Sequence, residues 1–153
     1  MAHSFQSIHV HIIFSTKNRL PLITPALKPR LLPYMGGILH GVGAVPIIIN
    51  GVEDHVHVLT SLPAKIALSD LIRDLKANSA KWANEELGEG FGWQIGYAAF
   101  SVSKSLEGTV RTYIEGQEEH HKRRTFQEEY LEFLNRHGIQ YDPRFVFEGE
   151  YGE

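Results

Sequence analysis

Two histidines separated by one valine, His55 and His57, form the first pattern in the sequence that could do chemistry. On a β-strand this spacing places both imidazoles on one face, roughly 6.6 Å apart along the strand. Two such rings can bind one metal ion. Polar residues on the exposed side of a strand give the same pattern, and they are more common than metal sites. A second copy, His9-Val10-His11, shows how readily the pattern arises, and spacing alone does not choose between the pairs.

A tyrosine and a glutamine four residues apart, Tyr113 and Gln117, form the second pattern. On a helix this spacing sets the phenol and the amide side by side. A tyrosine has an ordinary pKa near 10, so it attacks a phosphate at neutral pH only with help, which a nearby metal ion can supply. The alternative is core packing, because Tyr113 is adjacent to Ile114 and three residues beyond Val110.

The elements that must position these residues follow from hydrophobic periodicity. Residues 7–15 alternate like a half-buried strand, and β-branched runs predict strands at 45–50 and 55–59. These two form a hairpin through residues 51–54 or, alternatively, through a turn at Asn50-Gly51. Residues 93–103 predict a fourth strand. Helices are expected from Thr24-Pro25 to about residue 40, over 69–87, over 106–117, and from the capping box of Thr125 and Glu128 to Gly138. Pro29 and Pro33 predict that the first helix is kinked or begins late.

The order of these elements predicts the fold class. Strand, helix, strand, strand, helix, strand is the split β-α-β-β-α-β arrangement of ferredoxin-like domains. We therefore expect an α+β fold, with one antiparallel sheet, helices packed on it and two appended C-terminal helices. The length of 153 residues suits one domain, and we expect residues 1–153 to form it.

Charge is distributed unevenly along the chain. The formal net charge is −3, but residues 126–153 hold seven acids and two bases, so residues 1–125 carry +2. A surface that binds a polyanion is therefore compatible with the acidic total. Scattered surface charges on a neutral domain explain the same numbers.

The composition also excludes several kinds of protein and site. The chain has no cysteine, which excludes disulfides, thiolate metal sites and cysteine nucleophiles. Residues 1–4 lack the charged and apolar stretches of a signal peptide, and the apolar runs are too short to span a membrane. We expect a cytoplasmic protein with no membrane partner.

Several stretches, taken in order, resemble one family of enzymes. They are FSTKNR (14–19), GVEDHVHVL (51–59), WQIGY (93–97), FSVS (100–103), YIEGQEEHH (113–121) and TFQEE (125–129). Together they resemble the single-tyrosine HUH transposases of small bacterial and archaeal insertion sequences, which include the REP-associated tyrosine transposases. The family's histidine-hydrophobe-histidine motif maps onto His55-Val56-His57, and its tyrosine and glutamine map onto Tyr113 and Gln117. The resemblance thereby favours His55 and His57, and it leaves His9 and His11 as sheet surface or DNA contacts.

The resemblance implies a DNA strand transferase that acts on single strands. His55, His57 and Gln117 would hold one Mg²⁺ or Mn²⁺, and Tyr113 would attack the scissile phosphate to form a 5′-phosphotyrosine. It further implies recognition of subterminal DNA hairpins and a homodimer with shared active sites. The expected phosphate contacts are Lys17, Arg19, Arg73, Lys76 and Lys81.

Two other functions fit the fold. A ferredoxin-like module, or an inactivated relative of the transposases, would bind nucleic acid without cleaving it. A metal-dependent phosphodiesterase would release its product to water. Only the transposase requires a covalent adduct between protein and DNA.

Overall fold

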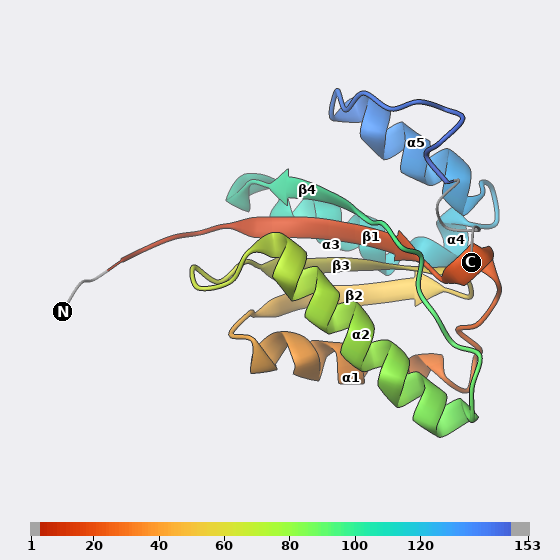
Figure 1. Ribbon diagram of the computed structural model, residues 1–153. Helices are drawn as coiled ribbons and strands as arrows, with labels where there is room; N and C mark the ends of the chain where they lie inside the picture. Colours follow the sequence, from red (N-terminus) through yellow and green to blue (C-terminus); the bar gives the residue numbers. More distant parts are fainter. Residues whose placement is uncertain (1–3, 148–153) are drawn as a thin grey trace.

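A computed structural model describes residues 4–147 of the chain (Figure 1). The strands are β1 (His9–Ser15), β2 (Pro46–Val52), β3 (His55–Ser61) and β4 (Ala98–Val102). The α-helices are α1 (Lys28–Gly41), α2 (Leu68–Leu87), α3 (Glu107–Glu115), α4 (Gln117–His120) and α5 (Phe126–Arg136). Two short 3-10 helices, η1 (Lys17–Arg19) and η2 (Lys104–Leu106), lie between them.

The four strands form one antiparallel sheet in the order β2-β3-β1-β4. This order confirms the predicted ferredoxin-like α+β fold, in which the first and third strands are neighbours. The register of β1 and β3 pairs Ser15 with His55 and Ile13 with His57. The two histidines of the predicted motif therefore lie on a central strand of the sheet.

Helices cover both faces of the sheet, and Figure 1 shows α1 and α2 on the side opposite α5. Val10, Ile12 and Phe14 of β1 belong to the core beneath α1 and α2. On the other face, Ile13 packs in a second core with residues of β4 and α5. The expectation of a half-buried first strand was wrong, because α5 covers the face that the alternation assigned to solvent.

The fourth strand is shorter than predicted and begins at Ala98. Trp93 makes only an isolated bridge with Thr16. At Gln94 the side-chain Oε1 accepts a 2.7 Å hydrogen bond from the Ser15 backbone amide. A side chain thus takes a position that the strand ladder would otherwise occupy, and the following residues leave the sheet before β4.

The predicted helices are present with two adjustments, and the structure also decides where the hairpin turns. The first helix begins at Lys28, because Thr24 Oγ1 caps a preceding turn at the Leu27 amide, and Pro33 lies inside the helix. The predicted helix over 106–117 is interrupted at Gly116, which separates α3 from α4. The hairpin turns at Glu53 and Asp54, so β2 continues through Gly51 to Val52.

The last helix confirms the predicted capping box. Thr125 Oγ1 accepts a hydrogen bond from the Glu128 amide, and the Glu128 carboxylate accepts one from the Thr125 amide. Gly138 follows the helix with a φ of +66°. Between residues 4 and 147, no helix is long and apolar enough to cross a membrane.

Candidate active site

The two histidines of β3 point to the sheet face that lies under the C-terminal helices. Both side chains are fully buried, and their ring centroids are 5.3 Å apart. The prediction that one strand face carries both rings is confirmed. The alternative, polar residues on an exposed strand face, is wrong because α3, α4 and α5 roof this part of the sheet.

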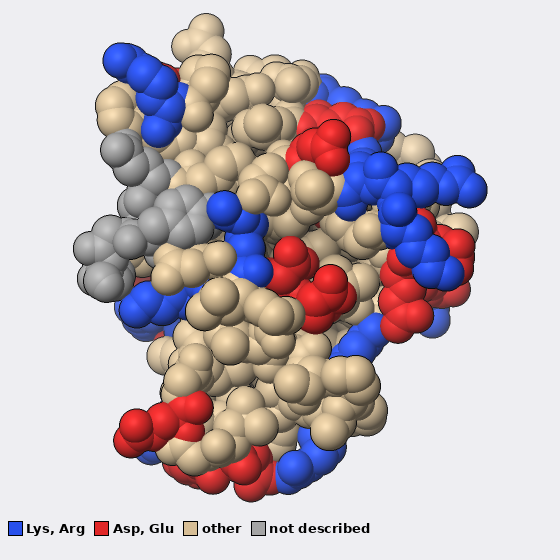
Figure 2. All heavy atoms as spheres, turned by 90° about the vertical axis from the view of Figure 1, so that its right-hand side faces the viewer, with Lys and Arg blue, Asp and Glu red and all other residues tan. Residues whose placement is uncertain are grey.

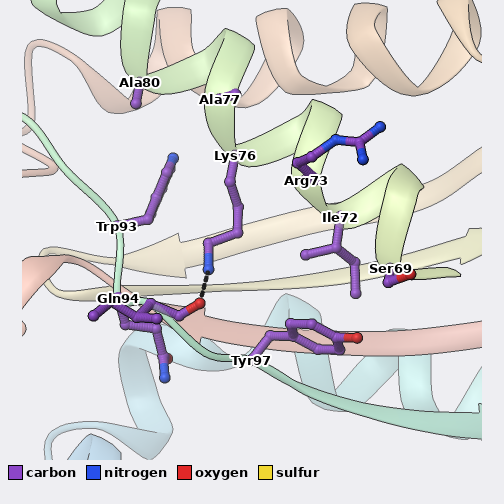
Figure 3. Close-up of a pocket in the computed structure, with 10 residues that line it drawn as sticks. Ser69, Ile72, Arg73, Lys76, Ala77, Ala80, Trp93, Gln94 and Tyr97 are labelled. Carbon is purple, nitrogen blue, oxygen red and sulfur yellow. Dashed lines mark hydrogen bonds between the residues drawn. The ribbon is translucent and has the colours of Figure 1, made fainter. Parts of the chain in front are cut away.

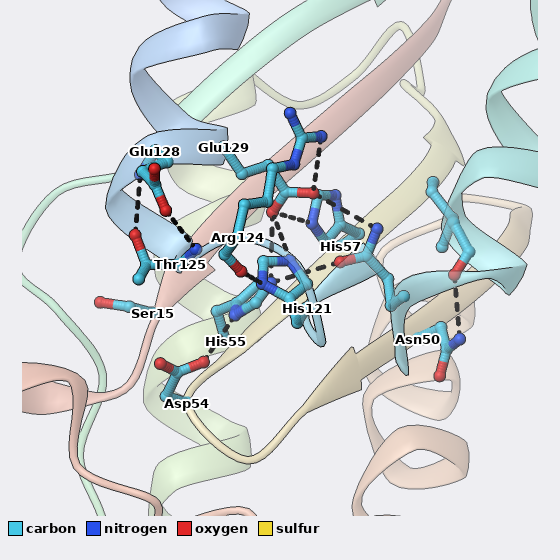
Figure 4. Close-up of polar contacts among 12 residues, drawn as sticks. Ser15, Asn50, Asp54, His55, His57, His121, Arg124, Thr125, Glu128 and Glu129 are labelled. Atoms are coloured by element: carbon cyan, nitrogen blue, oxygen red, sulfur yellow. Dashed lines mark hydrogen bonds and ion pairs between the residues drawn. The ribbon is translucent and has the colours of Figure 1, made fainter. Parts of the chain in front are cut away.

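A buried carboxylate from α5, Glu129, lies at the centre of the site (Figure 4). Its Oε1 atom is 2.9 Å from His57 Nε2, 3.0 Å from His121 Nε2 and 3.3 Å from His55 Nε2. Three imidazoles from β3 and the end of α4 therefore converge on one oxygen. Neither His121 nor Glu129 was among the site residues expected from the sequence.

The far nitrogen of each of these rings has a partner of its own. His55 Nδ1 is 2.7 Å from Asp54 Oδ1, and His121 Nδ1 is 3.0 Å from the Arg124 carbonyl oxygen. His57 Nδ1 is 2.8 Å from His11 Nε2. Such outer contacts fix the orientation of an imidazole and direct its other nitrogen toward the centre.

The interpretation of His11 as sheet surface or a DNA contact was wrong. Its side chain is buried, and it contacts His57 from the neighbouring strand β1. The pairing of β1 with β3 places the two rings in contact, as the ferredoxin-like order allows. His9, by contrast, lies toward the start of α3, with Nε2 3.8 Å from Glu107 Oε2.

Tyr113 brings its hydroxyl to the same cluster. The hydroxyl donates a short hydrogen bond to Glu129 Oε2, and Arg124 Nη2 donates one of 2.5 Å to the Tyr113 oxygen. The phenol ring lies 5.9 Å from the His57 ring and stacks on His120 at 4.5 Å. The second pattern in the sequence therefore reaches the first through α3, and it is not a simple core residue.

Gln117 lies beside Tyr113 even though Gly116 interrupts the helix between them. Its side chain is buried, with Oε1 3.3 Å from His55 Nε2 and Nε2 3.5 Å from Glu129 Oε2. The three residues expected to hold a metal ion, His55, His57 and Gln117, thus meet in one place.

Burial and hydrogen bonding shift the pKa values of these groups in different directions. Burial lowers the pKa of His57 to about 4, although the Glu129 carboxylate opposes this, and burial also lowers the pKa of His11. Burial disfavours the charged form of His55 too, but hydrogen bonds to Asp54 and Glu129 outweigh it and raise its pKa to about 9.

The nucleophile candidate and the central carboxylate are shifted as well. Burial, and then the charge of Glu129, raise the pKa of the Tyr113 phenol, while Arg124 opposes the rise. Burial would raise the pKa of Glu129, but hydrogen bonds from His121, His55 and His57 hold it well below its ordinary range. The site therefore contains an ionised carboxylate and a neutral phenol.

The donor atoms at the centre are spaced as the ligands of a metal ion are. One atom each from His55, His57, His121 and Glu129 lies within 4.8 Å of all the others. Ligands at 2.0–2.1 Å from a tetrahedral ion are about 3.4 Å apart, close to the separations of the three imidazoles from Glu129. The residue types and spacing therefore fit a divalent metal ion.

The five basic residues expected to contact DNA lie on two elements, α2 and η1. Arg73 and Lys76 of α2 line a pocket together with Tyr97 (Figure 3). Within it, Lys76 donates hydrogen bonds to the carbonyls of Ile95 and Gly96, and Arg73 pairs with Asp70 and Asp74. Lys81 is exposed farther along α2, whereas Lys17 and Arg19 lie in η1.

A polar groove opens next to the histidines. It is lined by Arg19 of η1, Glu53 and Asp54 of the hairpin turn, and residues 121–128, which include Lys122, Arg123 and Arg124. Figure 2 shows basic and acidic side chains intermixed on this end of the molecule. The groove thus leads from the surface to His121 and carries basic side chains along its walls. Acidic side chains lie among them on the same face of the molecule.

Besides the role of His11, the sequence reasoning missed three functional residues in the stretches quoted above, His121, Arg124 and Glu129. A signal for His121 was available, because it follows Gln117 at the same four-residue spacing by which Gln117 follows Tyr113. The signal for Glu129 is the capping box at Thr125, which fixes the start of α5 and hence places Glu129 in its first turn.

Comparisons with known proteins identify relatives of this chain. The chain is 26% identical over 117 residues to the ISDra2 transposase TnpA of Deinococcus radiodurans, covering 72% of this chain and 84% of that one. A crystal structure of a candidate transposase from Deinococcus radiodurans matches with a TM-score of 0.63 and 21% identity, over 76% of this chain and 95% of that chain.

A second solved structure shares the fold. It is a REP-associated tyrosine transposase bound to a REP hairpin, with a TM-score of 0.53 and 13% identity, over 74% of this chain and 66% of that chain. The family model for IS200-like transposases matches residues 4–117, which is more than half of the sequence. The chain with this site of paired histidines, tyrosine and glutamine therefore belongs to the IS200-like transposase family.

Proposed function

We propose that this transposase acts as one domain that cleaves and rejoins single-stranded DNA through Tyr113. The phenol oxygen attacks the scissile phosphorus, a Tyr113–phosphorus bond forms, and the bond from phosphorus to the 3′ oxygen breaks. The DNA is left with a 5′-phosphotyrosine on one side and a 3′-hydroxyl on the other. Attack by a second 3′-hydroxyl on the phosphotyrosine reverses the chemistry and rejoins strands without external energy.

The observation that carries this proposal is the position of the Tyr113 hydroxyl. It lies between Glu129 Oε2, which accepts its proton in a hydrogen bond, and Arg124 Nη2, which donates to its oxygen at 2.5 Å. A guanidinium at this position stabilises negative charge on the phenol oxygen and on the oxygens of an incoming phosphate. A buried tyrosine hydroxyl needs one hydrogen-bond partner, whereas this one has both a carboxylate acceptor and a guanidinium donor.

A divalent metal ion completes the proposed site. His55, His57 and Gln117 are the residues that would hold it, and the family resemblance implies Mg²⁺ or Mn²⁺. When bound, such an ion polarises the phosphate and stabilises the charge that develops on it. The chain itself keeps the ligands in place, because Asp54 and His11 fix the orientations of His55 and His57.

The proposed substrate is single-stranded DNA that carries subterminal hairpins. One solved relative is bound to a REP hairpin, which supports a hairpin partner here. We assign phosphate contacts to Lys17, Arg19, Arg73, Lys76 and Lys81. Arg19 is the best placed for the scissile strand, because it lines the groove beside the histidines.

We also propose that the protein works as a homodimer with shared active sites. Residues 103–106 connect β4 to α3 and contain η2, and Gly108, which accepts backbone angles that other residues resist, lies in the first turn of α3. In the structure this segment delivers Tyr113 to the histidines of its own chain. The same segment, swung outward, would deliver Tyr113 and Gln117 to the histidines of a partner.

A covalent adduct tests the proposed function directly. Single-stranded oligonucleotides copied from the DNA that flanks the coding region, labelled at the 3′ end, are incubated with the protein and Mn²⁺. A 5′-phosphotyrosine retains the 3′-labelled fragment, so label should migrate with denatured protein. Cut DNA without labelled protein would indicate a phosphodiesterase, and bound but uncut DNA would indicate a binding module. Either result contradicts the proposal.

A further inference from the structure

We propose that His121 and Glu129 are metal ligands together with His55 and His57, and that this set favours transition-metal ions over Mg²⁺. The inference rests on the proposed function, which supplies the metal ion and the residues His55, His57 and Gln117, and it adds two ligands, His121 directly after α4 and Glu129 of α5. It concerns the part of the chain beyond residue 117, where the match to the family model ends.

The hydrogen positions on two of the rings carry the argument. The Arg124 carbonyl can only accept, so His121 Nδ1 must hold the hydrogen of that contact. The Asp54 carboxylate imposes the same on His55 Nδ1. In the neutral form of each ring, Nε2 then carries no hydrogen and presents a lone pair. Both lone pairs face Oε1 of Glu129, which is itself an acceptor.

Acceptors that face one another at about 3 Å repel unless positive charge lies between them. Without a metal ion, protons on the rings supply that charge as hydrogen bonds to Glu129, and a metal ion that binds to the same nitrogen and oxygen atoms displaces those protons. A single divalent ion satisfies His55, His121 and Glu129 at once, and it accepts His57 as a fourth ligand. The spacing of these four donors, all within 4.8 Å of one another, fits that arrangement.

The local structure holds the two added ligands as firmly as it holds the motif histidines. Glu129 is fully buried, and it follows a complete capping box that fixes the first turn of α5. His121 is anchored by the carbonyl of Arg124, three residues later in the chain. The ring of His55 packs against that of His121, with centroids 4.3 Å apart.

The composition of the set predicts its metal preference. Three imidazole nitrogens and one carboxylate suit Mn²⁺, Co²⁺, Ni²⁺ or Zn²⁺, whose affinity for nitrogen ligands exceeds that of Mg²⁺. Mg²⁺ prefers oxygen ligands and retains several waters. We therefore expect Co²⁺ and Mn²⁺ to bind the isolated protein at least about 100-fold more tightly than Mg²⁺.

Calorimetric titration of Co²⁺ and Mn²⁺ into the protein without DNA tests the ligand set. Glu129→Gln preserves the size of the side chain, and His121→Ala changes a partly exposed residue. Each should weaken Co²⁺ binding by at least about 100-fold, because loss of even an outer-shell partner costs 10- to 100-fold. The matched controls are His120→Ala, at the adjacent position, and Glu128→Gln, which can still form a capping box. Both controls should bind Co²⁺ within about threefold of wild type.

NMR of the wild-type protein tests the same ligands without relying on variants that could fail to fold. With ¹⁵N-labelled histidine, addition of Zn²⁺ should move the Nε2 resonance of His121 along with those of His55 and His57. A His121 resonance that stays fixed while the other two move would overturn the assignment.

The failures of the two proposals are distinguishable. If Glu129→Gln and His121→Ala bind Co²⁺ as tightly as wild type while His57→Ala does not, the added ligands are wrong and the proposed function stands. If wild type binds none of the transition-metal ions, the ligand set is overturned, and the adduct assay decides the proposed function separately.

Discussion

At the scale of single residues, Glu129 connects the two halves of the site. One carboxylate oxygen faces the imidazoles of His55, His57 and His121, and the other accepts the hydrogen bond of Tyr113. A buried carboxylate surrounded by donors remains ionised, and its geometry fixes the directions of every group that it contacts. The nucleophile and the candidate metal ligands are therefore positioned by the same side chain.

The opposite pKa shifts of His55 and His57 predict how stability depends on pH without metal. His55 has its pKa raised from 6.5 to about 9, so its contribution is complete below pH 6.5 and is lost as pH rises through 9. His57 has its pKa lowered to about 4, so stability is lost as pH falls from 6.5 toward 4. Burial also lowers the pKa of His11, so His11 likewise contributes to the loss of stability as pH falls.

We therefore expect the free energy of unfolding, measured by urea titration in the presence of a chelator, to be greatest near pH 6.5. In His55→Asn, which cannot titrate, most of the decline above pH 6.5 should disappear while the acid side remains. An unchanged alkaline decline in that variant would show that the raised pKa of His55 is not its source.

Arg124 should contribute to catalysis through its contact with the Tyr113 oxygen. Arg124→Gln removes the guanidinium that donates to this oxygen, so the initial rate of adduct formation should fall about 10- to 100-fold. Arg111→Gln, on the same helix as Tyr113 but paired with Glu115 at the surface, serves as the control. Equal rates for the two variants would remove Arg124 from the mechanism.

At the scale of secondary structure, the site is divided between the sheet and the C-terminal helices. The β2-β3 hairpin and β1 supply His55, His57 and their supports. Tyr113 belongs to α3, Gln117 and the adjoining His121 to α4 and its end, and Glu129 to α5. Asn50 of β2 joins the two parts, since its Nδ2 donates to the carbonyl of Ile114 in α3. Docking of the helices on the sheet therefore assembles the site.

This division explains what the sequence could predict. The period of two on β3 places His55 and His57 on one face wherever the strand lies, and the four-residue spacing brings Gln117 beside Tyr113. His121 follows Gln117 at the same spacing, but the break at Gly116 precedes both residues, so their directions depend on how α4 packs. Glu129 comes after a further turn, and its direction depends on how α5 packs. Likewise, alternation in β1 could not show that α5 buries the second face of the strand. The sequence therefore did not reveal that His11, on that face, contacts His57.

The hairpin that carries His55 depends on a glycine. A Cβ atom at Gly51 would lie 2.3 Å from the His55 carbonyl oxygen, so Gly51→Ala must displace the two strands from each other. We expect it to lower the free energy of unfolding by about 2–4 kcal/mol. Gly37→Ala, in α1 with no atom within 4 Å of the added carbon, should instead stabilise the protein by up to about 1 kcal/mol.

Urea unfolding of the two alanine variants checks this comparison. Equal stability of Gly51→Ala and wild type would mean that the hairpin relaxes without cost. Binding of Co²⁺ to Gly51→Ala should weaken as well, because the displaced carbonyl is that of His55, the first histidine of the motif.

At the scale of the whole molecule, the C-terminal part of the site lies on one continuous stretch of chain, residues 107–136. Contacts of Tyr113 with Glu129 and Arg124 lie within residues 107–136, so they persist wherever that segment docks. The proposed homodimer would exchange this segment between subunits and leave the histidines of each sheet in place.

Mixing two inactive proteins tests the exchange. Tyr113→Phe retains the histidines, and His57→Ala retains the tyrosine, so a heterodimer with shared sites combines the intact parts in one of its two sites. Adduct formation should return after subunits exchange. If mass-tagged subunits exchange and the mixture stays inactive, each site is built within one chain.

The most direct test of the account is the identity of the residue that bears the DNA. The adduct formed with wild type is digested with trypsin and nuclease, and the peptides are analysed by mass spectrometry. Cleavage after Arg111 and Lys122 gives a peptide whose one tyrosine is Tyr113. We predict a nucleotide remnant on that peptide, and no adduct from a Tyr113→Phe variant that is as stable as wild type to within about 1 kcal/mol. A remnant on another residue, or an adduct from the phenylalanine variant, would contradict Tyr113 as the nucleophile.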